Sequence, residues 1–151
     1  MRFFLKTNGK TCLPTADELV AKMWKDGVNV SRVGWQESLR ESTGLTLSWD
    51  KWLDDKRWSG NLQSKENIYF EVVSLNSDLH LVFVEVDEDA CLVDIRAVHK
   101  AVIHIAERCC AKISIDQTTW IDVDEYRQEA KEYIQLSFEE ANERSLQECM
   151  E

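Results

Sequence analysis

The sequence predicts a single α+β domain over residues 1–151, in which about three helices pack on a mixed or antiparallel sheet. Three observations predict this class. The 151 residues suffice for one domain with a substantial core, stretches with strand and helix periodicity alternate along the chain, and no repeat or linker divides it. All five glycines and the single proline lie in the first 60 residues, so long regular elements are expected in the rest of the chain.

The first part of the chain predicts a strand, a helix and a second strand. Residues 2–6 have the composition of a strand. Thr15 and Glu18 match a capping box, in which each side chain satisfies a backbone donor at the start of a helix, and Gly27 marks the end of that helix. Residues 28–35 then predict a strand with an irregularity near its end.

Residues 37–62 have the least regular pattern. Leu45 and Leu47 predict a strand, and Ser48 is expected to cap a short helix. That helix would carry Trp49, Trp52 and Leu53. At least two of the four tryptophans in this part of the chain are expected in the core and one or two on the surface, where Trp is a frequent binding residue. The four are Trp35, Trp49, Trp52 and Trp58.

The middle of the chain predicts a hairpin followed by a helix. Residues 68–74 and 79–86 are β-branched and aromatic runs separated by a polar turn, which is typical of a β-hairpin. Because their apolar residues are nearly continuous, both strands are expected to be covered on both faces or well flanked. Residues 91–110 predict a helix with one buried stripe. The stripe consists of Ile95, Val98, Val102, Ile105 and Cys109.

The end of the chain predicts a short strand and one last helix. Residues 113–115 alternate between apolar and polar side chains, as a strand does. Asp122 and Glu125 form a second capping-box pattern, with acids where the helix dipole favours them. The helix is expected to continue to about Leu146. Its apolar residues are Tyr126, Ala130, Tyr133, Ile134, Phe138 and Ala141.

The charge of the chain is divided unevenly between its two halves. Residues 1–75 hold 11 Lys and Arg against 10 Asp and Glu, whereas residues 76–151 hold 7 against 18. A field of one sign over half a small protein favours a basic protein partner or a cation. It disfavours direct binding to nucleic acid or to an anionic membrane.

The acids concentrate at residues 85–89 and 116–132. The second of these segments is the predicted partner-binding surface, since complementary charge speeds association and selects the partner. Its predicted residues are Asp116, Trp120, Asp122, Asp124, Glu125, Glu129 and Glu132. The alternative is that these acids only keep the protein soluble.

The sequence predicts no catalytic residues, no cofactor and no metal. It has no nucleophile elbow, phosphate-binding loop or dinucleotide motif. His99 and His104 are five residues apart on one helix, which is the wrong spacing for a shared metal, and the histidines are expected to be partly exposed. Cys91, His99 and Cys109 match no zinc pattern.

One alternative from a different class is a divalent-metal-dependent enzyme. Glu85, Asp87 and Asp89 alternate along the chain and would face one way at a strand end, where three carboxylates suit Mg²⁺ or Ca²⁺. The simpler interpretation is a solvated strand end that runs into a helix N-terminus.

The cysteines and the terminus predict a cytoplasmic location. Five cysteines without a repeating spacing make a poor disulfide framework, so reduced thiols are expected. The first residues lack the apolar stretch of a signal peptide, and no run of apolar residues is long enough to span a membrane.

Two segments resemble bacterial immunity proteins, which neutralise toxins delivered between neighbouring cells. They are residues 13–19, LPTADEL, and residues 113–120, ISIDQTTW. The resemblance is one of size and style over most of the chain, and it carries over no functional residues. It implies that an acidic surface blocks the active site of a basic toxin, often a nuclease. An alternative with the same charge is a phage- or plasmid-type protein that mimics DNA and occupies a DNA-binding protein.

Overall fold

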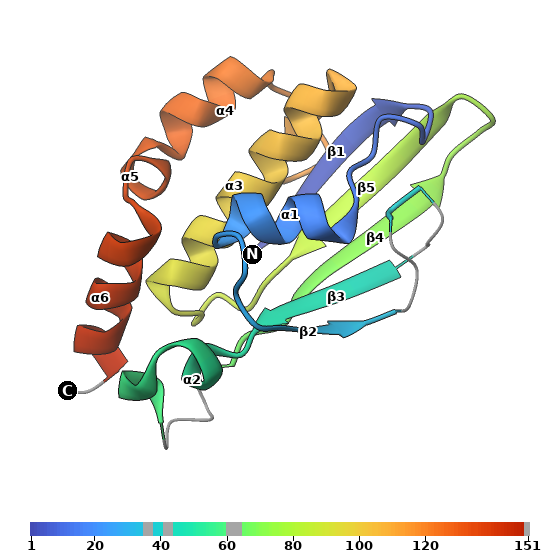
Figure 1. Ribbon diagram of the computed structural model, residues 1–151. Helices are drawn as coiled ribbons and strands as arrows, with labels where there is room; N and C mark the ends of the chain where they lie inside the picture. The colour runs from blue at the N-terminus through green and yellow to red at the C-terminus, as the bar shows by residue number, and fades with distance from the viewer. Residues whose placement is uncertain (35–37, 41–43, 60–64, 150–151) are drawn as a thin grey trace.

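The computed structural model describes residues 1–34, 38–40, 44–59 and 65–149, which form a six-stranded sheet with helices packed on it (Figure 1). The strand order is β2-β3-β4-β5-β1-β6, and all neighbouring strands are antiparallel. The predicted α+β class is confirmed, and the sheet is antiparallel rather than mixed. The strands are β1 Arg2–Asn8, β2 Val30–Val33, β3 Gly44–Trp49, β4 Ile68–Ser74, β5 Leu79–Glu85 and β6 Lys112–Ser114.

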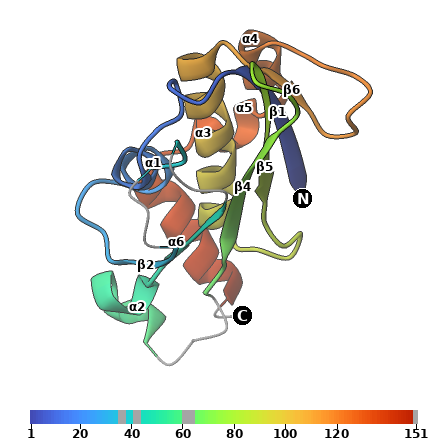
Figure 2. The same ribbon diagram turned by 90° about the vertical axis from the view of Figure 1, so that its right-hand side faces the viewer.

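The helices gather on one face of the sheet. Helices α1 and α3 contact each other, and α3 also contacts α4, α5 and α6, which lie farther from the strands (Figure 1). The helices are α1 Ala16–Met23, α2 Lys51–Asp54, α3 Leu92–Cys109, α4 Val123–Glu129, α5 Lys131–Ile134 and α6 Phe138–Cys149, with one turn of 3₁₀-helix, η1 Lys56–Trp58. Figure 2 shows α1, α3 and α6 on one side of strands β1, β4 and β5, and the loop of residues 115–121 on the other.

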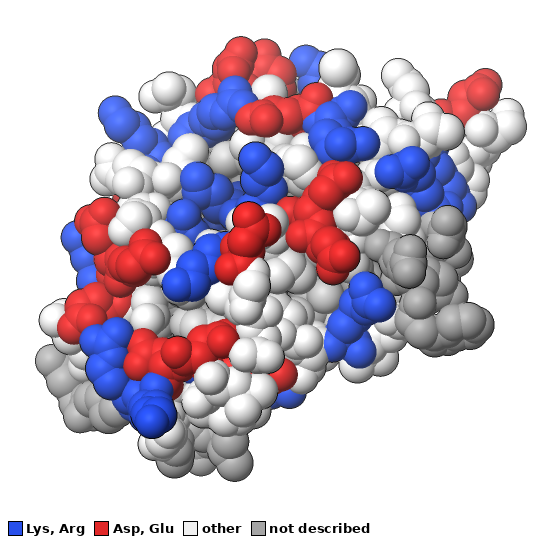
Figure 3. Space-filling model, viewed as in Figure 1, with Lys and Arg blue, Asp and Glu red and all other residues white. Residues whose placement is uncertain are grey.

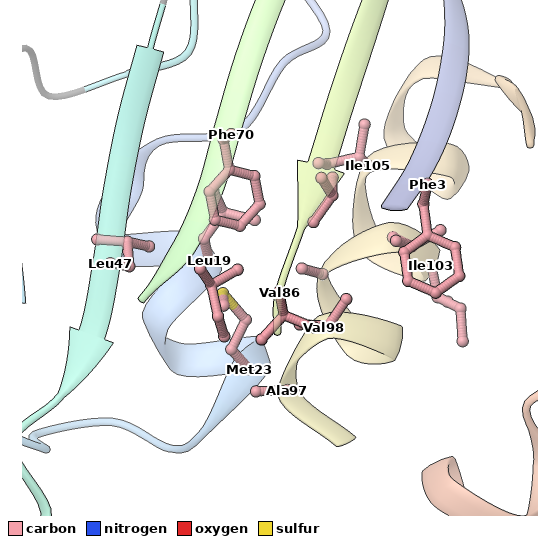
Figure 4. Packing of buried hydrophobic residues seen from close by; sticks show 14 of the residues in the cluster. Phe3, Leu19, Met23, Leu47, Phe70, Val86, Ala97, Val98, Ile103 and Ile105 are labelled. Atoms are coloured by element: carbon pink, nitrogen blue, oxygen red, sulfur yellow. The ribbon is translucent and has the colours of Figure 1, made fainter. Parts of the chain in front are cut away.

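The core lies between the sheet and helices α1 and α3. Phe70 and Leu47 from the sheet face Leu19 and Val98 from the helices, and all four side chains are buried (Figure 4). Strand β4 alternates between buried and exposed residues, because the helices cover only one of its faces. Of the two predicted alternatives, β4 is therefore flanked by β3 and β5 but not covered on both faces.

Local hydrogen bonds confirm the predicted hairpin and both predicted helix starts. Asn76 Oδ1 accepts from the backbone N–H groups of two residues in the β4–β5 turn. Thr15 Oγ1 accepts from the N–H of Glu18 at 3.1 Å, and Asp122 Oδ1 accepts from the N–H of Glu125 at 2.9 Å. The first N–H groups of a helix have no carbonyl acceptor within the helix, and the short side chains of Thr15 and Asp122 supply one.

The last helix is broken into three, and the prediction of one helix to Leu146 is wrong. A reciprocal capping box starts α6: Ser137 Oγ accepts from the N–H of Glu140 at 3.0 Å, and Glu140 Oε1 accepts from the N–H of Ser137 at 3.3 Å. The apolar spacing continues through the break, since half-buried Ile134 and buried Phe138 are four positions apart. A Ser followed three residues later by Glu was the signal for this helix start.

The least regular part of the sequence also departs from its prediction. Ser48 lies within β3 and caps no helix; Asp50 precedes α2 instead. Trp49 is therefore a strand residue, and it is buried together with Trp58. Two core tryptophans are thus confirmed, Trp52 is half-buried, and Trp35 lies outside the described residues.

Candidate functional site

The turn after β6 and helix α4 together form a small pocket at the edge of the sheet. The pocket has a volume of about 150 Å³, and the acidic residues Asp116 and Glu129 are part of its lining. Its apolar lining includes Ile113, Ile121 and the ring of Tyr126. The structure therefore brings two of the predicted partner-binding residues, which are 13 positions apart in the sequence, to one concave site.

Asp116 is held in place by the turn that it starts. Its Oδ1 accepts from the Ser114 hydroxyl at 2.9 Å and from the N–H groups of Thr118 and Thr119 at 2.8 and 2.9 Å. The N–H groups of Thr119 and Thr118, and then the Ser114 hydroxyl, lower the pKa of Asp116 because they stabilise its charged form. Asp116 is thus an exposed, fixed negative charge on the pocket rim.

Three exposed glutamates extend the negative charge along α4 and α5. Glu125 and Glu129 are one helical turn apart on α4, and Glu132 follows in α5. No ion pair involves any of the three within the described residues. We call Asp116, Glu125, Glu129, Glu132 and the pocket between the turn and α4 the acidic surface.

The other three predicted residues have structural contacts of their own. Asp122 caps α4, and Asp124 pairs with Arg127 at 2.8 Å. Trp120 is half-buried, and the Lys6 ammonium lies 4.1 Å from the centre of its ring. Trp120 therefore folds back toward β1, and Tyr126 supplies the aromatic wall of the pocket.

A buried pair of rings supports the pocket from the core side. Tyr126 Oη lies 2.6 Å from His99 Nδ1, and the His99 ring stacks on Tyr133 with centroids 4.7 Å apart. Burial lowers the pKa of His99 to about 4 and raises that of Tyr126. Both groups are therefore neutral near pH 7. His80 is also buried, so the prediction of partly exposed histidines is wrong for both His80 and His99.

The buried His99 ring makes stability depend on pH. Its pKa is about 4 in the folded protein against 6.5 for an exposed histidine, so between these values the unfolded chain binds a proton that the folded chain does not. Lowering the pH from 7 to 4 should reduce the free energy of unfolding by about 3 kcal/mol through this group. Urea denaturation of the wild type and His99→Gln across this range tests it: the variant should have the shallower pH dependence, and equal slopes would contradict the assignment.

Ion pairs between the two halves of the chain neutralise part of the uneven charge. Among the described residues, four ion pairs join a base of residues 1–75 to an acid of residues 76–151: Arg2–Glu85, Lys25–Glu139, Lys51–Asp94 and Arg57–Glu143. Red and blue atoms consequently interleave over the face seen in Figure 3. Part of the acidic excess therefore neutralises the chain's own bases. The glutamates of the acidic surface pair with none of those bases in the described structure.

The most buried of these pairs sits among tryptophans. Lys51 Nζ donates to Asp94 Oδ2 at 2.7 Å, and neither side chain is exposed to solvent. Trp24 Nε1 donates to the other carboxylate oxygen at 3.1 Å, and the Trp49 and Trp58 rings lie within 6 Å of the ammonium. Solvent does not reach the Lys51–Asp94 pair, so we assign this cluster a role in stabilising the fold. Its signal in the sequence was a lysine among closely spaced tryptophans.

Two of the three carboxylates of the metal alternative, those of Glu85 and Asp87, make contacts within the fold. Glu85 pairs with Arg2 at 3.2 Å, and Asp87 Oδ1 accepts from the N–H of Asp89 at 3.0 Å. Over residues 1–34, 38–40, 44–59 and 65–149, no three His, Cys, Asp or Glu side chains gather closely enough to hold a metal ion.

The cysteines depart from the predicted set of reduced thiols. Cys12 and Cys109 form a disulfide that joins the segment before α1 to the last turn of α3. Their positions are 97 residues apart, so no local spacing indicates the bond. Cys91, Cys110 and Cys149 are free thiols.

Comparison of the chain with protein-family models, curated proteins and solved structures finds no match. Among the described parts of the chain, no helix has the length and apolar character needed to cross a bilayer. The fold and the site together define an α+β protein with an acidic surface beside a small pocket. The likeness to immunity proteins stays a prediction from sequence.

Proposed function

We propose that this chain is a non-catalytic immunity-type protein that binds a basic protein toxin through the acidic surface. The observation that carries the proposal is the pocket with Asp116 and Glu129 on its rim and Ile113 and Ile121 in its lining. A lysine or arginine side chain of the partner fits this arrangement, because its apolar stem packs on the isoleucines while its charge meets the carboxylates.

The neutral Tyr126–His99 pair behind the pocket supports a binding role. Burial moves the pKa of His99 to about 4 and raises that of Tyr126 further above 7, so neither pKa is matched to proton transfer near pH 7. The other two charges of the acidic surface, Glu125 and Glu132, extend the field over which a basic partner is attracted.

Comparative capture from an extract of the cells that encode the chain tests the proposal. Three baits are used: the wild type, a site variant with Glu125, Glu129 and Glu132 changed to Lys, and a control variant with Asp26, Asp78 and Glu148 changed to Lys. The control acids are exposed and have no ion pair in the described structure. Both variants therefore change the net charge equally.

We expect a basic protein that the wild type and the control variant retain and the site variant loses. If all three baits retain the same proteins, or the protein lost is acidic, the proposal is wrong. If DNA competes with the chain for the captured partner, the proposal is wrong and the DNA-mimic alternative is supported.

A further inference from the structure

Four of the five cysteines lie in two pairs, one at each end of α3. The Cys12–Cys109 disulfide holds its C-terminal end. At its N-terminal end, Cys91 is the N-cap residue, and its Sγ lies 3.5 Å from Sγ of Cys149, the last residue of α6. These two residues are 58 positions apart, so the fold brings them together.

The packing of α6 on α3 fixes this second pair. Ser145 Oγ accepts from the N–H of Val93 at 2.9 Å and donates to the Ala141 carbonyl at 2.8 Å. Cys149 follows Ser145 by one helical turn and so lies on the same side of α6, toward Cys91. A disulfide bond is about 2.05 Å long, so the sulfurs need to approach by roughly 1.5 Å. Cys149 is in the last turn of its helix, where such a movement disturbs few contacts.

We propose that Cys91 and Cys149 are the site of a second disulfide bond, formed by a small-molecule disulfide oxidant such as oxidised glutathione. The Cys149 thiolate attacks one sulfur of the oxidant and releases one thiol. The Cys91 thiolate then attacks Sγ of Cys149 and releases the second thiol. The two cysteines lose two protons and two electrons, and the oxidant disulfide gains them as two thiols.

The surroundings of Cys91 set the order of these steps. Burial, the Cys149 thiol and the charge of Asp94 raise the pKa of Cys91 to about 12, while the Lys51 charge acts in the opposite direction. Cys91 is therefore a poor first nucleophile, and the oxidant meets Cys149 first. Once Cys149 carries the oxidant, its Sγ is within reach of Cys91, and proximity compensates for the small thiolate fraction.

The bond would fix the C-terminal end of α6 to the N-terminal end of α3, which also carries the buried Asp94. Asp94 is in the first turn of α3, three residues after Cys91. With the Cys12–Cys109 bond, the two covalent loops overlap along α3 and together span residues 12–149. An overlapping pair of loops restricts the unfolded chain more than the first bond alone.

The test is oxidation of the purified full chain with oxidised glutathione, followed by alkylation of free thiols and peptide mapping without reduction. We expect a cross-linked peptide containing Cys91 and Cys149, Cys110 outside the cross-link as the free thiol or its glutathione mixed disulfide, and a melting temperature higher by about 10 °C. A Cys110→Ser variant is the matched control and should give the same cross-link. The Cys91→Ser variant should stop at the mixed disulfide on Cys149.

Two results would overturn the proposal. One is a wild-type chain in which Cys91 stays fully alkylatable while Cys149 carries only glutathione. The other is a cross-link that includes Cys110 in place of either residue. Because the map is read on the wild type, neither result depends on a variant that folds, and neither depends on the partner.

Discussion

Replacement of Lys51 by methionine is expected to lower the free energy of unfolding by about 3–5 kcal/mol. The variant keeps a side chain of similar length but leaves the carboxylate of Asp94 buried without its cation. Trp24 Nε1 still donates to that carboxylate, although one neutral donor does not replace the ammonium 2.7 Å away. Urea denaturation at pH 7 measures the change through the shift in midpoint.

Two further variants separate the ion pair from general effects of substitution. Lys51→Met combined with Asp94→Asn removes both charges and keeps an oxygen acceptor for Trp24, so most of the lost stability should return. Lys56→Met is the matched control, since Lys56 is exposed and has no ion pair in the described structure; its effect should stay within about 0.5 kcal/mol. A Lys51→Met loss as small as that of the control would show that the pair is solvated.

Reversal of Glu125, Glu129 and Glu132 to Lys is expected to slow association with the captured basic partner by about 10- to 10³-fold at low ionic strength. The three glutamates are exposed and carry no ion pair in the described structure, so the change removes attraction without breaking an ion pair; the one side-chain contact it affects is that of Glu132 with the Tyr133 hydroxyl. Stopped-flow mixing measures the rate. Asp122 and Asp124 are left intact, because they cap α4 and bind Arg127.

The control for this prediction is the variant with Asp26, Asp78 and Glu148 changed to Lys. It has the same net charge as the site variant and should slow association only slightly, because its changes lie on other elements. If both variants slow association equally, the partner responds to total charge and not to this surface. If neither slows it, the surface has no part in the encounter.

Features set by neighbouring residues could be predicted from the sequence. The β4–β5 hairpin, helix α3 and the caps at Thr15 and Asp122 all depend on turn chemistry or periodicity within a few positions. The break before α6 was missed because the apolar spacing continues through it, although Ser137 and Glu140 carried the signal.

Features that depend on distant residues could not be predicted. Lys51 and Asp94 are 43 positions apart, and the two cysteine pairs are separated by 97 and 58 positions. The uneven charge was visible in the sequence. The ion pairs that partly neutralise it join residues of the two halves, so they could be identified only from the structure.

The candidate site was partly predictable for the same reason. Asp116 and Glu129 were selected from the density of acids, and the fold brings them to one pocket. Trp120 was selected as the aromatic residue of the predicted partner-binding surface, but Lys6 lies over its ring. Tyr126 was assigned only to the apolar side of the last helix, yet it forms both the wall of the pocket and part of the core.

Carboxylate footprinting of the complex with the captured partner tests the central claim most directly. Exposed carboxylates are coupled to an amine with a carbodiimide, in the free chain and in the complex, and the modified positions are quantified by mass spectrometry. Labelling of Asp116, Glu125, Glu129 and Glu132 should fall in the complex, while Asp26, Asp78 and Glu148 keep their labelling. Undiminished labelling of the first group, with protection elsewhere, would contradict the assignment of the acidic surface as the partner-binding site.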